Sequence, residues 1–292
     1  MKLYRLPLIV VVVLLLAVPF CASAAPSPTP APAVPQAQQV QQPQQPQQRR
    51  ITPQEAFALV AGEAEKGSLA AMVRLGSFYE QGLGVGRNFL KAREWYEKAA
   101  QAGSLEALYN LGVCYEIGIG TSGDMKEAVR YYEQSAEKGF SLASYKLATM
   151  YTAGVGVGRD NAKAVSFLTR AAEGGFGVAA NDLGVLYLRG DLGLAKDPVK
   201  AHDMFGKAAT LGVVDAMKNI AVLYKDGIGR PVSAQKAVVW YTIARKAGYP
   251  KELVDSVIDE LSKKLPAAEK KKSEREADEW FTKNFPQQTA VK

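Results

Sequence analysis

Apolar residues along most of this chain recur at the spacing of amphipathic helices. Ala107, Leu111 and Tyr115 lie four positions apart, so they share one face of a helix. Residues 128–136 repeat this spacing in the next segment. Gly118 lies between the two segments and can adopt the left-handed conformation that ends a helix. The pattern therefore predicts two antiparallel helices joined by a short turn.

The two-helix pattern recurs with a nearly constant period. The glycines that follow the second helices are spaced 36, 36, 36, 37 and 36 residues apart, at Gly67, Gly103, Gly139, Gly175, Gly212 and Gly248. The extra residue is accounted for by the longer loop at residues 190–197. A fixed period of this length is typical of a repeat array, in which each unit buries its apolar face against the next.

The glycine-rich stretch LGVCYEIGIG at residues 111–120 looks like a nucleotide-binding loop when it is taken alone. Related stretches occur at residues 75–84, 147–156, 183–193 and 220–229. A dinucleotide-binding fingerprint needs a strand before its glycines, whereas a helical pattern precedes them here. We therefore expect no cofactor at these loops and interpret each as a helix end with its exit turn. Gly112 is expected to let a neighbouring helix approach closely.

Two segments contain most of a known repeat pattern. The matching residues are Ala107, Leu111, Gly112, Tyr115, Gly118 and Gly120 in one, and Lys91, Ala92, Trp95, Tyr96, Lys98, Ala99, Ala100 and Gly103 in the other. On these residues the chain resembles the Sel-1-like repeat family, a subfamily of tetratricopeptide-type helical solenoids. The resemblance covers about residues 53–285. It implies an all-α fold, a right-handed solenoid of antiparallel helix pairs with a C-terminal capping helix.

The period divides the chain into regions. The predicted solenoid spans residues 51–249, with repeats at 53–88, 89–124, 125–160, 161–197 and 198–233 and a partial repeat at 234–249. Residues 250–285 keep a helical pattern without the repeat signature and are expected to form capping helices, with Trp280 covering the open end. Residues 286–292 form a short tail.

The N-terminal region predicts export. Residues 1–24 contain Lys2 and Arg5, then an apolar run, then Ala22-Ser23-Ala24, which together are typical of a cleaved signal peptide. An uncleaved membrane anchor and a lipidated Cys21 are the alternatives. Residues 25–50 are rich in proline and glutamine and are expected to form a disordered linker. We expect the mature protein in the periplasm, with full secretion as the alternative.

Charge and residue counts exclude several functional classes. The formal net charge is +7, and the charges are scattered, so no nucleic-acid surface is predicted. Only two cysteines and one histidine occur, which cannot build a Cys/His zinc site. Cys114 aligns with Phe, Met and Leu of other repeats and is expected in the core. His202 is expected at the surface. No catalytic, cofactor or metal site is predicted.

The resemblance places a partner-binding groove on the concave face, which first helices line. Its candidate residues form three levels and an edge: Val73, Tyr109, Tyr145, Asn181 and Lys218 at the first level, Ser77, Val113, Thr149, Val185 and Val222 at the second, Glu80, Glu116, Thr152, Leu188 and Lys225 at the third, and Arg74, Asn110, Lys146, Asp182 and Asn219 at the edge. Tyr109 and Tyr145 occupy the same position in adjacent repeats and are expected to stack as neighbours. Aromatic residues of this kind are common in interface hot spots, so the pair is a candidate partner-binding site. The groove also changes from acidic at Glu80 and Glu116 to basic at Lys218 and Lys225.

These observations predict a non-catalytic exported scaffold that binds a protein or peptide partner in envelope signalling or assembly. The membrane would be a partner only if the N-terminal segment stays uncleaved. The rival prediction is an enzyme or binding protein that acts on cell-wall fragments or β-lactams. A branch of the family linked to β-lactams carries a cysteine pair in each repeat, and this chain does not. It also lacks a Ser-x-x-Lys motif paired with Lys-Thr-Gly.

Overall fold

The structure is a computed structural model that describes residues 51–289. The predicted signal peptide and linker, residues 1–50, lie outside the described residues. All regular structure between residues 51 and 289 is helical, which confirms the all-α prediction. The helices are α1 (Pro53–Glu65), α2 (Leu69–Gln81), α3 (Phe89–Gln101), α4 (Leu105–Ile117), α5 (Met125–Glu137), α6 (Ser141–Ala153), α7 (Asn161–Glu173), α8 (Gly177–Arg189), α9 (Pro198–Thr210), α10 (Val214–Asp226), α11 (Ala234–Lys246), α12 (Lys251–Lys263), α13 (Ala267–Asn284) and α14 (Pro286–Thr289).

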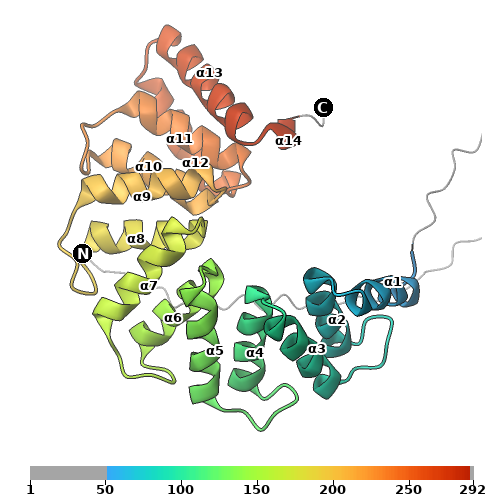
Figure 1. Ribbon diagram of the computed structural model, residues 1–292. Helices are drawn as coiled ribbons and strands as arrows, with labels where there is room; N and C mark the ends of the chain where they lie inside the picture. The colour runs from blue at the N-terminus through green and yellow to red at the C-terminus, as the bar shows by residue number, and fades with distance from the viewer. Residues whose placement is uncertain (1–50, 290–292) are drawn as a thin grey trace, which may run out of the picture. The chain divides into compact units, whose positions relative to one another are not determined.

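Successive helices pack against one another in chain order (Figure 1). We call α2, α4, α6, α8 and α10 the first helices, and α3, α5, α7, α9 and α11 the second helices. Helix α13 departs from the order because it packs against α11, with the Trp280 ring 5.0 Å from the Trp240 ring. The protein is thus a solenoid of repeated helix pairs that ends in a capping helix.

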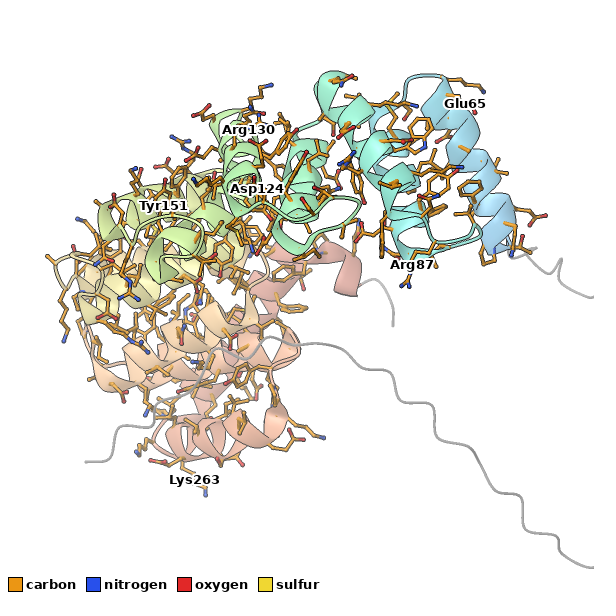
Figure 2. The ribbon with its side chains drawn as sticks, turned by 90° about the horizontal axis from the view of Figure 1, so that it is seen from below. Glu65, Arg87, Asp124, Arg130, Tyr151 and Lys263 are labelled. Carbon is orange, nitrogen blue, oxygen red and sulfur yellow. The ribbon has the colours of Figure 1, made fainter. Side chains whose placement is uncertain are left out.

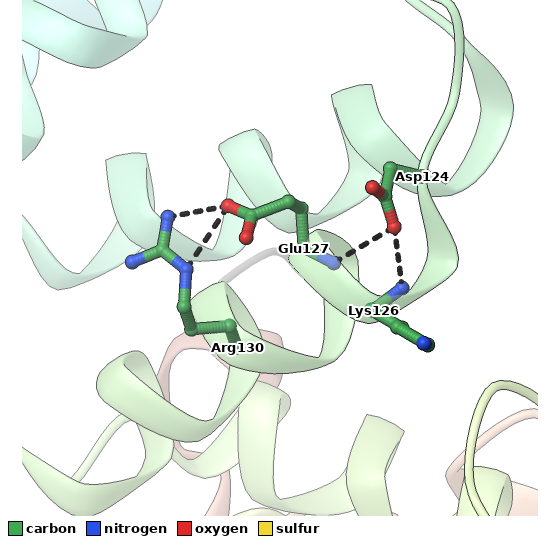
Figure 3. Close-up of polar contacts among 4 residues, drawn as sticks. All are labelled: Asp124, Lys126, Glu127 and Arg130. Carbon is green, nitrogen blue, oxygen red and sulfur yellow. Dashed lines mark hydrogen bonds and ion pairs between the residues drawn. The ribbon is translucent and has the colours of Figure 1, made fainter.

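Each second helix begins at a polar residue that caps it. In α5, Asp124 Oδ1 accepts hydrogen bonds from the backbone N–H groups of Lys126, at 2.9 Å, and Glu127, at 3.2 Å (Figure 3). The Glu127 carboxylate in turn lies 2.6 Å from Arg130 Nη2. Equivalent caps stand at Asn88, Asp160, Asp197 and Ser233. Because these side chains satisfy N–H groups that lack a helical partner, they fix where each second helix starts.

Two glycines show how the repeat motif works. Gly118 ends α4 in the left-handed conformation, with φ of 77°, as predicted. Gly112 makes room for a ring, because a Cβ atom there would lie 2.5 Å from Cε1 of Tyr132. The same fit recurs between Gly76 and Tyr96, and between Gly184 and Phe205. The close approach expected at Gly112 is therefore that of a second-helix aromatic ring. Figure 2 shows side chains occupying the space between the helices along the array.

Candidate binding face on the first helices

The candidate groove residues lie on one face of the first helices. We define the first-helix face by the positions of Val73, Arg74, Ser77 and Glu80 on α2 and their equivalents on the other first helices. A cavity of about 430 Å³ opens on this face among α2, α3 and α4, and these four side chains line it together with Asn110 of α4. Val73 is only 6% exposed, so most of its side chain belongs to the core.

Glu80 and Glu116 each accept a hydrogen bond from a tyrosine of the following helix. The Tyr96 hydroxyl donates to Glu80 Oε2 at 2.9 Å, and the Tyr132 hydroxyl donates to Glu116 Oε2 at 2.6 Å. Burial, reinforced by the neighbouring carboxylate, raises the pKa of both phenols. One oxygen of each glutamate is therefore committed to holding a buried hydroxyl.

Lys146 completes the environment of Glu116. Its Nζ donates to Glu116 Oε1 at 2.8 Å and lies 5.8 Å from the centre of the Tyr132 ring. Both side chains are largely covered, with relative exposures of 29% for Lys146 and 20% for Glu116. These two predicted groove residues therefore bind each other across α4 and α6.

Tyr109 and Tyr145 do not stack on each other, which corrects the prediction made for this pair. The Tyr109 ring lies 5.3 Å from the Tyr132 ring and 5.7 Å from the Phe140 ring. The Tyr145 ring lies 4.9 Å from Phe176. The prediction failed because each tyrosine ring packs against the phenylalanine that precedes the next first helix.

A polar chain continues the first-helix face on α6, α8 and α10. The Tyr145 hydroxyl donates to Asp182 Oδ2 at 2.9 Å, and burial raises the pKa of the Asp182 carboxyl. Farther along, Asn219 Nδ2 donates to Asn181 Oδ1 at 3.1 Å, and Lys218 Nζ donates to Asn219 Oδ1 at 2.6 Å. Burial lowers the pKa of the Lys218 ammonium.

The charge gradient along the face is smaller than the residue types alone indicate. Lys225 Nζ lies 3.0 Å from Asp226 Oδ1, which raises the Lys225 pKa through a hydrogen bond. Glu116 likewise has Lys146 beside it. Among the candidate charges, Glu80 and Lys218 have no ion pair within the described residues, and of these two Glu80 lines the cavity.

The remaining candidates for chemistry do not line this cavity. Cys114 is 1% exposed, and burial raises the pKa of its thiol to about 12, so it is a core residue as predicted. His202 is half-buried and packs edge-on against Tyr224, with ring centres 5.4 Å apart. Within residues 51–289, no group of His, Cys, Asp or Glu side chains could hold a metal ion. Over the same range, no helix is long and apolar enough to cross a bilayer.

Comparisons with known proteins agree with this architecture. The model of the Sel1 repeat matches residues 69–104, 105–140, 141–176, 177–213 and 214–249. These units begin at α2, whereas the frame predicted from the sequence begins at residue 53, so α1 precedes the first matched repeat. No curated protein matches the chain.

Solved structures provide the second comparison. A Sel1 repeat protein from Oxalobacter formigenes is 35% identical over 68% of this chain and 81% of its own, with a TM-score of 0.58. A protective antigen of uropathogenic Escherichia coli with an SLR fold is 22% identical over 82% of this chain and 58% of its own, with a TM-score of 0.45. An immunity protein from Pseudomonas aeruginosa is 16% identical over 68% and 76% of the two chains, with a TM-score of 0.47.

Proposed function

Because the chain belongs to the Sel1 repeat family, we propose that it is a non-catalytic scaffold that binds a protein or peptide partner on its first-helix face. The cavity among α2, α3 and α4 is the observation that carries the proposal. It combines an apolar wall at Val73 with polar groups at Ser77, Glu80 and Asn110. Binding sites commonly combine apolar walls with a few polar groups that fix orientation.

The sequence pattern at the N-terminus supports a place for this scaffold in the cell envelope. Lys2, Arg5, the apolar run and the small residues Ala22 to Ala24 together favour export and cleavage. We place the mature protein in the periplasm, where it would take part in envelope signalling or assembly. The intact mass of the protein from an envelope fraction tests this, because cleavage after Ala24 removes a defined mass and an uncleaved anchor does not.

The binding proposal is tested by cross-linking capture with two matched variants of the full chain. Ser77→Arg/Thr149→Arg places two large cations on the first-helix face. Ser166→Arg/Thr210→Arg makes the same changes on second helices. Thr149 and Thr210 are well matched, since both are exposed and each hydroxyl donates to a backbone carbonyl three residues earlier.

We expect mass spectrometry to identify a protein that the wild type and the second-helix variant capture and the first-helix variant loses. Thermal melts must first show that both variants fold as well as the wild type. Equal capture by the two variants would move binding to another face. Capture of nothing above background by the wild type would contradict the scaffold proposal and favour a small-molecule ligand.

A further inference from the structure

The chain contains a lysine site that it fills with its own side chain. At this site Glu116 accepts two hydrogen bonds, one from the Tyr132 hydroxyl on Oε2 and one from the Lys146 ammonium on Oε1. Lys146 extends from the next first helix, and its Nζ lies 5.8 Å from the ring centre of the same tyrosine. The Glu116 carboxylate and the Tyr132 ring thus lie beside one ammonium group, which is a favourable environment for a partly desolvated cation.

The same frame recurs one repeat earlier without the lysine. Glu80 accepts the Tyr96 hydroxyl on Oε2 at 2.9 Å, as Glu116 does from Tyr132. The residue 36 positions before Lys146 is Asn110, whose side chain is too short and uncharged to take its place. Glu80 Oε1 therefore has no ammonium beside it in the described part of the chain.

The open cavity lies where that lysine would be. Its volume of about 430 Å³ falls within the range of about 300–1,000 Å³ typical of ligand sites. Ala70 and Val73 supply an apolar wall, and Ser77, Glu80 and Asn110 supply polar groups. A long side chain with an aliphatic stem and a cationic end matches this combination.

The charges around the cavity favour a cation. Glu80 and Glu106 line it, and Arg74 is the one basic side chain in the wall, so carboxylates outnumber guanidinium groups. Arg74 is itself exposed. The Glu80 carboxylate thus faces an open cavity, whereas the Glu116 carboxylate is paired with Lys146.

Resting on the proposed function, we propose that this cavity is the specificity pocket for a lysine side chain of the bound protein or peptide. The ammonium pairs with Glu80 Oε1, and the stem lies along Val73 and Ala70. The pocket can be recognised by comparing the two repeats. Glu80 and Tyr96 match Glu116 and Tyr132, but Asn110 stands where the next repeat has Lys146.

The test uses the full chain and ten-residue peptides that are randomised except at one central position. That position holds lysine, arginine, acetyl-lysine or norleucine, and enrichment is read by mass spectrometry. Lysine peptides should be enriched over norleucine and acetyl-lysine peptides by about tenfold or more, because only the lysine peptides can donate a charge-assisted hydrogen bond to Glu80. An equal or greater enrichment of arginine peptides would overturn the assignment to lysine.

Two pairs of variants make the test specific. Glu80→Gln should abolish the preference for lysine, whereas Glu116→Gln should keep it, although each loses a carboxylate that accepts a tyrosine hydroxyl. Asn110→Lys should also abolish it, because the new lysine occupies the cavity as Lys146 occupies its own site. Thr210→Lys adds the same charge on a second helix and should change nothing.

Thermal melts keep folding and binding apart, since Asn110→Lys is expected to lose binding without losing stability. Peptide enrichment that ignores the central residue, or survives Asn110→Lys, would overturn the pocket and leave the scaffold proposal standing. The scaffold proposal itself fails only if the wild type captures nothing above background in the cross-linking experiment.

Discussion

Helices α4 and α8 hold equivalent places in their repeats, yet their N-termini are anchored in different ways. Ser104 caps α4 by accepting a hydrogen bond from the Ala107 N–H at 3.2 Å. Phe176 precedes α8 and makes no cap hydrogen bond, but its ring lies 4.9 Å from Tyr145. Phe140, before α6, has the same relation to Tyr109.

This comparison changes the interpretation of the two tyrosines. Val73 and Asn181 hold the repeat position that Tyr109 and Tyr145 hold in the two central repeats. The first helix that follows Val73 is preceded by Ser104, and the one that follows Asn181 is preceded by Val213. Tyrosine therefore stands at this position where a phenylalanine begins the following first helix. Tyr109 and Tyr145 stabilise the junction between repeats, which a hot-spot interpretation based on residue type does not reveal.

The largest expected effect on stability comes from comparing the loss of the Phe176 ring contact with the loss of the Ser104 cap hydrogen bond. Phe176→Ala should lower the free energy of unfolding by about 3 kcal/mol, because a large ring contact is lost and a void remains. Ser104→Ala should lower it by about 1 kcal/mol, the usual cost of a lost cap. Urea denaturation of both variants measures the difference. Equal losses would show that the ring contact does not replace the cap.

The next effect concerns the space that Gly112 leaves. Gly112→Ala should cost about 2 kcal/mol, because its Cβ would lie 2.5 Å from the Tyr132 ring. Adding Tyr132→Leu should cost less than the sum of the single changes, since Ala148 and Leu168 already form this combination one repeat later. A double-mutant cycle in urea checks the coupling. Strict additivity would show that the two sites do not share one space.

A smaller effect compares a repeat that has a tyrosine–glutamate pair with one that lacks it. Tyr132→Phe should cost about 1 kcal/mol, because Glu116 loses a hydrogen bond of 2.6 Å. Phe205→Tyr should also destabilise, since its hydroxyl would face Leu188, the residue that aligns with Glu116. Combining Phe205→Tyr with Leu188→Glu should recover stability, as thermal melts would show. No recovery would mean that the pairing is not transferable between repeats.

The smallest effect depends on pH. Burial raises the folded-state pKa of Asp182 above its unfolded-state pKa. As the pH rises from the unfolded-state pKa through the folded-state pKa, ionisation of Asp182 therefore lowers the free energy of unfolding. Asp182→Asn should therefore raise stability at pH 7 by less than about 1 kcal/mol and lose this advantage near pH 3, below both pKa values. Melting temperatures at the two pH values measure this.

Asp197 provides a control of opposite sign. A hydrogen bond from the Lys200 backbone lowers its pKa, so its ionised form favours the folded state at neutral pH, and that contribution is lost as the pH falls. Asp197→Asn should be less stable than the wild type at pH 7 and similar to it near pH 3. The same sign of change for both variants would contradict the assignment of burial as the cause at Asp182.

The fold was predictable because its signals are local. Glycine at 118 and a polar residue such as Asp124 set helix ends within a few residues, and the period then repeats the unit. The side-chain partners at the candidate site were less predictable. Tyr145 contacts residues 31 and 37 positions away, at Phe176 and Asp182, and neither contact follows from helical periodicity.

One signal in the sequence would have found part of the missed site. Glutamate at positions 80 and 116 is followed 16 residues later by Tyr96 and Tyr132, and these are hydrogen-bonded pairs. Comparing the repeats of the chain with one another therefore predicts which polar side chains are already paired. The export signal and the linker fall outside the described residues and stay predictions.

The way the two terminal helices pack has a mechanical consequence. Helix α1 packs mainly on α2, whereas α13 reaches over α12 to pack on α11, so the two ends of the array are not equally secured. Under a pulling force we expect unravelling to start at α1 and to advance one helix pair at a time. Each pair of 36 or 37 residues would release roughly 120 Å of extended chain. We therefore expect the chain to extend under force in steps of nearly equal length that start at α1.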